Sequence, residues 1–363
     1  MAGLEFSVPY NNDLETLDEL FKLKELNGNR IREVYLSGPQ RYSASGRIVE
    51  EIDEAKLVSV MSLIHAEGIR VNLVMNPTCE GLDWYEKENV KEKMEFLTRM
   101  HKEHGLEAVT IANPLFVEYV KETLPDIEIG VSVLGGINST QGAVIYEKLG
   151  ATVVTPDVDC NRDIEQLKQL KLATKLEFKL MVNEGCLYKC PFRRFHFNYI
   201  SHKSKELGPV ENDSFFAHCA QVTDSDHSQI LKSGWIRPED LEKYGEITHF
   251  FKIVGRARPK SMVIRTTKAY MNQRWDGDLM DILSSSLNRY SLEVGAHLDN
   301  NSLSRFNFFE KVTTCDHACL DCDYCSTLAK DLITLQTPTR GKLEDLGLTQ
   351  LIDEMERRGK LAR

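Results

Sequence analysis

The sequence predicts an α/β protein with a TIM-type (β/α)8 barrel and a small cysteine-rich C-terminal extension. Eight short apolar runs are each followed by a helical pattern or a long loop, which is the composition of a (β/α)8 barrel. The runs lack regular polar alternation, as expected for parallel strands that are buried on both faces. No run leads into a Gly-x-Gly-x-x-Gly turn, so we prefer the barrel to an open doubly wound sheet.

The predicted elements alternate along the chain from the start. The strands are expected at residues 5–10, 31–38, 70–76, 108–113, 127–135, 152–157, 175–183 and 249–256. Helical patterns with an apolar face lie at residues 14–23, 53–68, 90–105, 115–124, 141–150, 163–170 and 259–273. We therefore expect a barrel over residues 1–275 with an inserted cysteine loop at 183–248. The extension covers residues 276–363 and ends in a charged amphipathic helix.

Composition bounds the classes of function. The chain has 363 residues, of which 42% are hydrophobic, enough to fill one large core. Its formal net charge of −10 argues against an extensive nucleic-acid-binding face. No apolar run approaches the roughly 18 residues of a membrane span. The first residues also lack the basic and then apolar order of a signal peptide. We expect a cytoplasmic protein without membrane contact.

Two cysteines mark the first candidate site. Nine cysteines without a secretory signal indicate metal or redox use rather than disulfides. Cys186 and Cys190 follow the strand at 175–183, on the face where barrels gather reactive groups, and Cys219 comes later in a predicted polar loop. Three thiols could thus converge on one metal centre, although free cysteines also pack as small hydrophobes. The residues beside the pair favour a site, and they include Arg193, Arg194 and His196.

The segments 177–197 and 235–259 resemble the collagenase-like peptidase U-32 family, and the resemblance extends over residues 4–275. Members of that family include the oxygen-independent hydroxylation proteins of ubiquinone biosynthesis and of RNA modification. The family name records an early protease assignment. The resemblance implies a TIM-type barrel with a cysteine-ligated [4Fe–4S] cluster, and oxygen-independent hydroxylation or a related redox modification of a ring or nucleobase. It also suggests a small-molecule or modified-base substrate and a partner protein of the same family.

The resemblance suggests roles for particular residues. Cys186, Cys190 and Cys219 would hold the cluster. The fourth ligand stays open between Cys160, which follows the neighbouring strand, and Cys79, which lies in a turn on the same face. Four further residues would handle the substrate or protons, with packing, surface or salt-bridge roles as the alternatives: His196, Arg193, Arg194 and Arg256. Arg256 matches a basic position of the family and would pair with a carboxylate or phosphate.

Four more cysteines form the second candidate site, in the extension. Cys315, Cys319, Cys322 and Cys325 stand at C-x3-C-x2-C-x2-C spacing, which strongly indicates a metal centre. The continuous run is closer to ferredoxin-like cluster binding than to the two separated pairs of a zinc knuckle. An iron–sulfur cluster or zinc is therefore expected here. The first three cysteines also fit the radical-SAM spacing, but that motif belongs to an early βα loop.

Two other functions stay open. A U-32-type peptidase fits the family name, although the sequence has no G-x-S-x-G or H-E-x-x-H signature. A zinc-stabilised scaffold that binds a partner enzyme would use the same thiols without catalysis.

Overall fold

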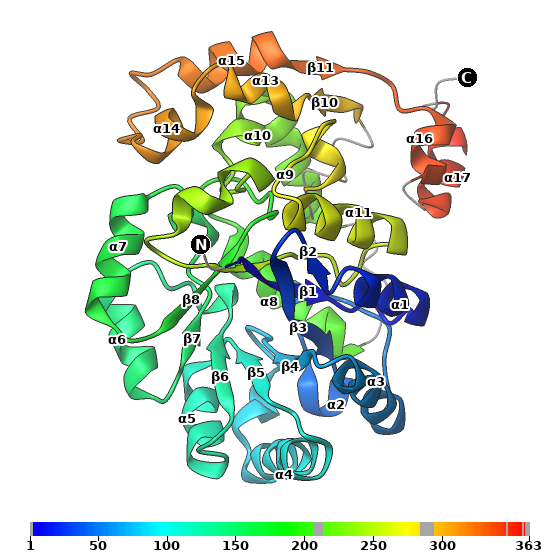
Figure 1. Cartoon of the computed structure of the whole chain (residues 1–363), viewed down its shortest axis with the longest axis vertical. Coiled ribbons are helices and arrows are strands. Elements are labelled where there is room, and N and C mark those ends of the chain that lie inside the picture. Colours follow the sequence, from blue (N-terminus) through cyan, green and yellow to red (C-terminus); the bar gives the residue numbers. More distant parts are fainter. Residues whose placement is uncertain (1–2, 207–212, 284–293, 346–347, 358, 360–363) are drawn as a thin grey trace.

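Parallel strands close into a barrel, and helices surround it (Figure 1). The computed structural model describes residues 3–206, 213–283, 294–345, 348–357 and 359. Within these ranges the barrel strands are β1 (Glu5–Pro9), β3 (Asn29–Ser37), β4 (Arg70–Met75), β5 (Ala108–Ile111), β6 (Glu128–Val131), β7 (Val153–Val154), β8 (Glu177–Met181) and β9 (Phe250–Lys252). Neighbouring strands pair in the order β1-β9-β8-β7-β6-β5-β4-β3, and parallel pairing of β1 with β3 closes the ring. The predicted TIM-type barrel is confirmed.

Each predicted strand is present, with shorter bounds in several places. The strand expected at 127–135 ends at Val131, because Ser132 caps the 3-10 turn η2 (Val133–Gly135) by accepting the Leu134 N–H. The strand expected at 152–157 shrinks to β7, before Pro156, which has no N–H to donate to a ladder. A short strand that was not predicted, β2 (Glu25–Leu26), pairs antiparallel with β3.

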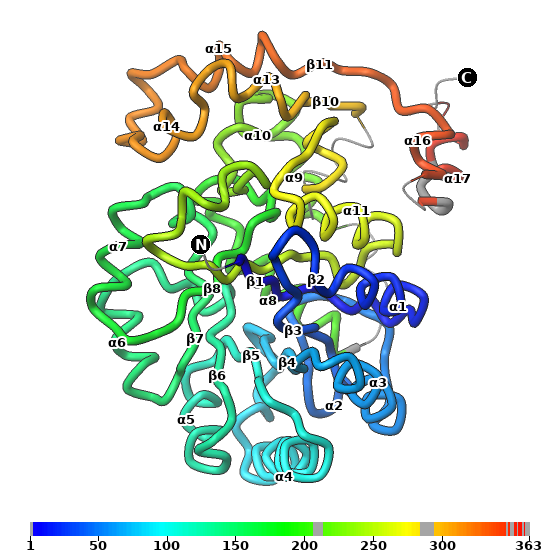
Figure 2. The backbone as a smooth tube through the Cα atoms, in the orientation of Figure 1, coloured from blue at the N-terminus to red at the C-terminus, as the bar shows by residue number. Residues whose placement is uncertain are grey.

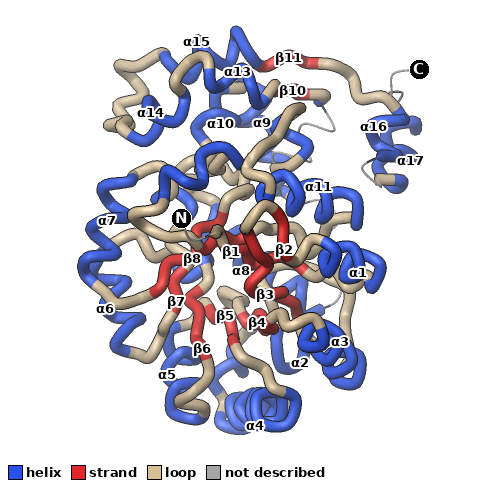
Figure 3. The backbone as a smooth tube through the Cα atoms, in the orientation of Figure 1, coloured by secondary structure: helices blue, strands red, loops and turns tan. Residues whose placement is uncertain are grey.

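Helices cover the outside of the barrel, as Figure 3 shows in blue around the red strands. Those that follow barrel strands are α1 (Leu14–Lys22), α2 (Gln40–Ser43), α3 (Glu54–Ala66), α4 (Lys87–His104), α5 (Pro114–Thr123), α6 (Thr140–Lys148), α7 (Ile164–Ala173) and α11 (Lys260–Met271). Side-chain caps begin many of them; Asp53, for example, accepts the Lys56 N–H at the start of α3. The predicted helical patterns are therefore realised as helices with defined starts.

The segment between β8 and β9 is the predicted insertion, and it is largely helical. It contains α8 (Arg193–Glu206), α9 (Ser214–Ser225), α10 (Ser228–Lys232) and the 3-10 helix η4 (Pro238–Tyr244). Cys219 lies within α9 and not in the polar loop that the sequence suggested. The loop prediction was wrong because the segment SFFAHCAQV carries enough apolar residues to pack against α8 and α10, and Asp213 caps it by accepting the Phe216 N–H.

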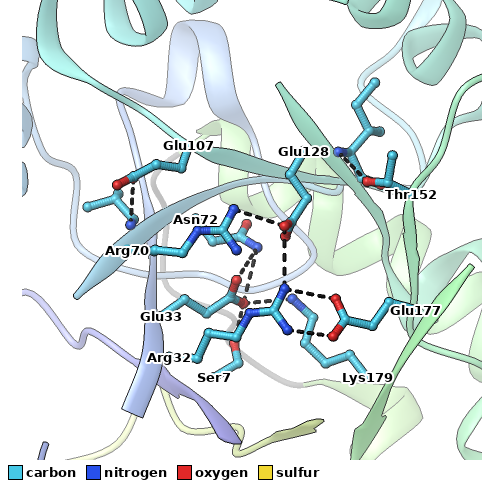
Figure 4. Close-up of polar contacts among 12 residues, drawn as sticks. Ser7, Arg32, Glu33, Arg70, Asn72, Glu107, Glu128, Thr152, Glu177 and Lys179 are labelled. Carbon is cyan, nitrogen blue, oxygen red and sulfur yellow. Dashed lines mark hydrogen bonds and ion pairs between the residues drawn. The ribbon is translucent and has the colours of Figure 1, made fainter. Parts of the chain in front are cut away.

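A buried polar cluster lies inside the barrel (Figure 4). The Glu33 carboxylate accepts from Lys179 Nζ at 2.6 Å, from Ser7 Oγ at 2.6 Å and from Asn72 Nδ2 at 3.1 Å. These side chains come from four strands, so the cluster ties the barrel together across its axis. Burial alone would raise the pKa of Glu33, but the charge of Lys179 and these hydrogen bonds outweigh burial and lower the pKa to about 2.

A second ionic cluster stands at the opposite end of the strands from the predicted site. Arg32 pairs with Glu128 at 3.5 Å and with Glu177 at 2.8 Å (Figure 4). It also pairs with Glu5 at 3.1 Å. The three carboxylates belong to the first residues of β1, β6 and β8. Polar groups at this N-terminal face of a barrel serve stability rather than catalysis.

The extension packs onto the barrel. It contains β10 (Ala296–Leu298), β11 (Ile333–Leu335), α13 (Asn300–Ser304), α14 (Phe308–Thr313), α15 (Tyr324–Leu332), α16 (Arg340–Asp345) and α17 (Thr349–Arg357). In Figure 2 the orange segment of α13 to α15 runs past the green α10. Phe308 stacks on Trp235 of the insertion at 5.3 Å between ring centroids, and both belong to the main hydrophobic core. The core therefore continues beyond residue 275, where the barrel was predicted to end.

Among the described residues, no helix is both long and apolar enough to cross a membrane.

Candidate functional site

A cavity of about 320 Å³ lies at the C-terminal ends of the barrel strands, on the face where barrels carry their active sites. Much of its wall comes from residues at or just after strand ends: Tyr35, Asn76, Ser132, Thr155, Met181 and Lys252. Helices α8 and α9 of the insertion supply the rest of the wall. The volume falls in the range of about 300–1,000 Å³ that small-molecule pockets have.

Three of the predicted cluster ligands line this cavity. Cys186 and Cys190 follow β8 directly, and Cys219 reaches the cavity from α9. The insertion therefore folds back over the strand ends, as the sequence led us to expect. In the described part of the chain, no three Cys, His, Asp or Glu side chains are grouped as a site for a single metal ion.

The two candidates for a fourth ligand lie away from this cavity. Cys160 is buried at the end of the 3-10 turn η3 (Val158–Cys160), and its thiol faces the Ile137 carbonyl oxygen at 3.9 Å. Burial raises the pKa of Cys160 to about 12, which is the behaviour of an inert core thiol. Cys79 is half-buried in the turn after β4 and is not part of the cavity wall. The structure thus brings together three of the five barrel cysteines.

Glu184 and Arg47 flank the thiol of Cys186, and sequence reasoning missed both. The Cys186 thiol faces Glu184 Oε1 at 3.6 Å, and Arg47 Nη2 contacts Glu184 Oε2 at 3.2 Å. Burial and the Glu184 charge raise the pKa of the Cys186 thiol, while Arg193 and Arg47 act in the opposite direction. Glu184 could have been found from its place beside the cysteine motif. Arg47 lies in the loop between α2 and α3, and no sequence motif marks it as a site residue.

The two predicted arginines of α8 have different positions. Arg193 lines the cavity, but its guanidinium is engaged by Asp157 at 2.7 Å and by Asp159 at 2.8 Å. It also donates to the Leu187 carbonyl oxygen. These contacts of Nη1 and Nη2 hold the cysteine loop in place, while the buried Nε has no hydrogen-bond partner among the described residues. Arg194 is exposed on the helix and lies outside the cavity wall.

His196 lines the cavity and pairs with a carboxylate. Its Nε2 lies 3.0 Å from Asp213 Oδ2, and its ring stacks on Phe215 at 5.3 Å. Because an ionised carboxylate only accepts, the Asp213 contact is a hydrogen bond that Nε2 donates. The pair joins α8 to the first residue before α9.

Arg256 and Lys252 form the cationic side of the cavity. Arg256 is buried and donates to the hydroxyls of Ser37 and Ser45. Lys252, at the end of β9, places its Nζ 4.0 Å from the centre of the Tyr35 ring. Neither cation has a carboxylate partner among the described residues, so both can meet an anionic group in the cavity. Lys252 was missed, although a lysine inside the apolar run HFFKIVGR was a usable signal.

Burial acts on both of these cations. It lowers the pKa of Arg256 to about 10, and burial together with Lys179 lowers the pKa of Lys252. A buried amine with a lowered pKa at the mouth of a barrel is a group that can accept a proton or bind an anion.

The four cysteines of the extension line a second, smaller pocket of about 60 Å³. They lie on the loop between α14 and α15 and in the first turn of α15. The predicted second site is therefore local, and it is built against residues of the barrel side that include Tyr188.

Fold and site together define a (β/α)8-barrel protein with a thiol- and arginine-lined cavity at the catalytic face. The chain belongs to peptidase family U32, whose family model matches residues 18–279. A curated relative is an uncharacterized protease of Methanocaldococcus jannaschii, 28% identical over 338 residues that cover 91% of this chain and 99% of the relative.

A solved structure of a U32 peptidase supports the fold. It superposes with a TM-score of 0.52 at 18% identity, over 70% of this chain and 94% of that one. At this identity the likeness concerns the fold alone. The family match stops at residue 279, so it covers the barrel thiols but not the four cysteines of the extension.

Proposed function

We propose that the protein is an iron–sulfur-dependent redox enzyme that modifies a ring or nucleobase, by oxygen-independent hydroxylation or a related reaction. The observation that carries this proposal is the meeting of Cys186, Cys190 and Cys219 on one cavity at the C-terminal face of the barrel. Thiolates are the usual ligands of a [4Fe–4S] cluster. When bound, such a cluster would supply one-electron transfer.

Two cations near Cys186 would offset part of the charge of a metal-bound thiolate. Arg193 and Arg47 act to lower the pKa of Cys186, although burial and Glu184 outweigh them and leave this pKa raised. The three thiols leave one cluster position to a ligand other than Cys79 or Cys160, and the cavity offers Glu184, His196 or the substrate itself. Apolar side chains that include Leu187 and Phe197 form other parts of the wall and keep water from that side of the site.

Residues of the chain would bind and orient the substrate. Arg256 and Lys252 would hold an anionic group of a small molecule or modified base, since both cations face the cavity without a carboxylate partner among the described residues. His196 would hold or accept a proton at Nδ1, with Asp213 fixing the ring. We place this work in the cytoplasm, where thiols stay reduced, with a partner protein of the same family.

A thiol peptidase is the second candidate. The family name favours it, and so does the joint presence of the His196–Asp213 pair and cysteine thiols around one cavity. The pKa of Cys186 weighs against it. A nucleophilic thiol must be deprotonated by its surroundings, and here burial and Glu184 raise its pKa. A bound metal, in contrast, deprotonates a coordinated thiol outright.

The test is iron and sulfide analysis of protein purified and reconstituted without oxygen. We expect the wild type to show the broad visible absorption of an iron–sulfur centre, which zinc lacks because it is d10. Cys186→Ser, Cys190→Ser and Cys219→Ser should each lose most of the barrel iron, because an open iron site makes a cluster labile. Cys79→Ser is the matched control and should keep it.

Two outcomes would overturn the assignment. One is full iron retention in all three cavity variants. The other is metal-independent cleavage of a fluorogenic peptide by the wild type that Cys186→Ser and His196→Ala both abolish. That result would establish the peptidase instead. Zinc without iron in the wild type would favour the non-catalytic scaffold.

A further inference from the structure

The pocket that holds the four extension cysteines is built from two parts of the chain. Cys315, Cys319, Cys322 and Cys325 line it from the extension. Asp159, Arg162, Tyr188 and Lys232 line it from the barrel and its insertion. The family match ends before the cysteines, and the proposed cluster in the barrel does not use them. The pocket is thus a separate feature that needs its own explanation.

The pocket has an excess of positive charge. Arg162 is buried, lies over the Trp235 ring at 4.3 Å, and donates to the carbonyl oxygens of Leu231 and Trp235. In the part of the chain that the structure describes, it has no ion pair with a carboxylate. Lys311 also lines the pocket, as does Lys232, whose Nζ lies 3.2 Å from Asp226 Oδ2. A buried cation is costly unless a negative group offsets it.

Four thiolates around a metal would provide that negative charge. A divalent ion with four thiolates carries a net charge of −2, and an iron–sulfur cluster with four thiolates is likewise an anion. Arg162 and Cys325 line the same pocket of about 60 Å³. The cations and the thiols of this pocket therefore complement each other only when the thiols are deprotonated.

The local backbone also suits thiolate ligands. The His317 N–H donates to Cys315 Sγ at 3.3 Å, and hydrogen bonds of this kind tune metal-bound sulfur. His317 has a positive φ of 62°, which turns the loop back between the first two cysteines. Cys325 lies in the first turn of α15, where the helix dipole favours negative charge.

A stacked pair of rings joins this loop to the loop that carries two barrel ligands. Tyr188, between Cys186 and Cys190, stacks on His317 with 4.9 Å between centroids and 23° between planes. Asp159 lines the same pocket and accepts the Lys189 N–H at 3.1 Å. The second pocket therefore borders the loop 186–190 directly.

We propose that the four extension cysteines hold an iron–sulfur centre whose charge Arg162 and Lys232 offset, and that this centre fixes the loop 186–190 through the Tyr188–His317 stack. The continuous C-x3-C-x2-C-x2-C run favours the iron–sulfur class over zinc, which prefers two separated pairs. The centre itself is independent of the proposed function. Only the idea that an ordered loop 186–190 helps to hold the barrel cluster rests on the proposed function.

The first experiment counts iron and sulfide after anaerobic reconstitution of the full chain. Cys319→Ser/Cys322→Ser changes two exposed residues, so the fold should persist. This double variant should lose roughly half of the iron while Cys186→Ser loses the other half, because two clusters are held separately. If Cys186→Ser loses none and the double variant still loses iron, the proposed function fails and this inference stands. Unchanged iron in the double variant, or zinc alone in this pocket, overturns the inference.

The second experiment tests the charge of the pocket in the Cys186→Ser background, where only the extension centre remains. Arg162→Met and Lys232→Met should each lower the midpoint potential, because removing a nearby cation disfavours the more negative reduced form. Lys330→Met, exposed on α15 and outside the pocket, should leave it unchanged. Lys232→Met keeps the test valid if Arg162→Met fails to fold. An unchanged potential in every folded pocket variant overturns the role given to these cations.

The third experiment tests the contact between the loops by amide hydrogen exchange. The Lys189 N–H is bonded to Asp159, so its protection reports the order of the loop 186–190. In the reconstituted double variant this amide should exchange faster than in the wild type, while amides of α3 on the far side should not change. Equal exchange of Lys189 in both proteins overturns the loop-fixing part.

Discussion

Buried charges in this molecule divide into two kinds. Glu33 and Lys179 are fully buried and satisfy each other, which is what the barrel interior requires. Lys252 lies on β9, next to the β8 strand that carries Lys179, and Arg256 follows β9. Both border the cavity, and neither forms an ion pair with a carboxylate among the described residues. A paired buried charge serves the fold, and an unpaired one at a cavity serves a ligand. This contrast supports the proposal that Arg256 and Lys252 bind an anionic group of the substrate.

Glu33 gives a prediction for acid stability. Its folded-state pKa of about 2 lies below the value of about 4.3 in an unfolded chain. The ionised carboxylate therefore stabilises the fold above the unfolded pKa, and this contribution is lost as the pH falls from about 4 to about 2. Glu33→Gln should lower the free energy of unfolding at pH 7 by about 3–5 kcal/mol, since it leaves Lys179 unpaired. Urea unfolding across this pH range measures both effects.

The matched control for Glu33 is Glu103→Gln, at an exposed position on α4. It should keep the wild-type stability and the wild-type acid profile. If Glu33→Gln showed the same loss of stability at low pH as the wild type, the carboxylate would not be the group that titrates.

At the level of elements, the insertion after β8 covers the C-terminal ends of the barrel strands and completes the wall of the cavity. Helices α8 and α9 carry His196 and Cys219 to the mouth, and the His196–Asp213 contact links the two helices. The starting point of α9 is decided by Asp213, whose carboxylate caps the helix. One side chain thus sets both the order of α9 and the partner of the histidine.

Asp213 can be tested by comparing two substitutions. Asp213→Ala removes the cap and should cost about 1 kcal/mol of helix stability, seen as faster amide exchange in the first turn of α9. Asp213→Asn should keep the protection, because asparagine caps a helix about as well as aspartate. Equal loss of protection in both variants would mean that the ionic contact with His196, and not the cap, orders the helix.

At the level of the whole molecule, barrel and extension share one core. Leu298, Leu303 and Phe308 of the extension belong to the same cluster as the barrel residues. Deleting the extension would expose this surface. For that reason the metal experiments above use point substitutions in the full chain. A shared core also predicts a single cooperative unfolding transition.

The shared core can be measured at the Trp235–Phe308 stack. Phe308→Ala should lower the free energy of unfolding by about 3–5 kcal/mol, because it leaves a cavity between the insertion and the extension. Phe306→Ala is the control, since Phe306 is 42% exposed and its loss should cost little. Urea unfolding followed by tryptophan fluorescence compares the two. A small effect at Phe308, or two separate transitions, would indicate that the extension folds independently.

The sequence alone determined the features that local patterns record. Apolar runs followed by helical periodicity mark buried strands and amphipathic helices, so the barrel was predictable from the sequence. The exact ends of some strands, such as β6 and β7, were not. Cysteines that are close in sequence stay close in space, so Cys186 and Cys190 line one pocket and the four extension thiols line another.

Only the tertiary structure decided which distant groups meet. Cys219 reaches the barrel cavity on a helix, whereas Cys160, one strand away in the ring, points into the core instead. Arg47 and Arg162 arrive from segments without a motif. The physical reason is that a side chain's direction depends on how loops and helices pack, and residues far apart in sequence leave no local periodicity that records this packing.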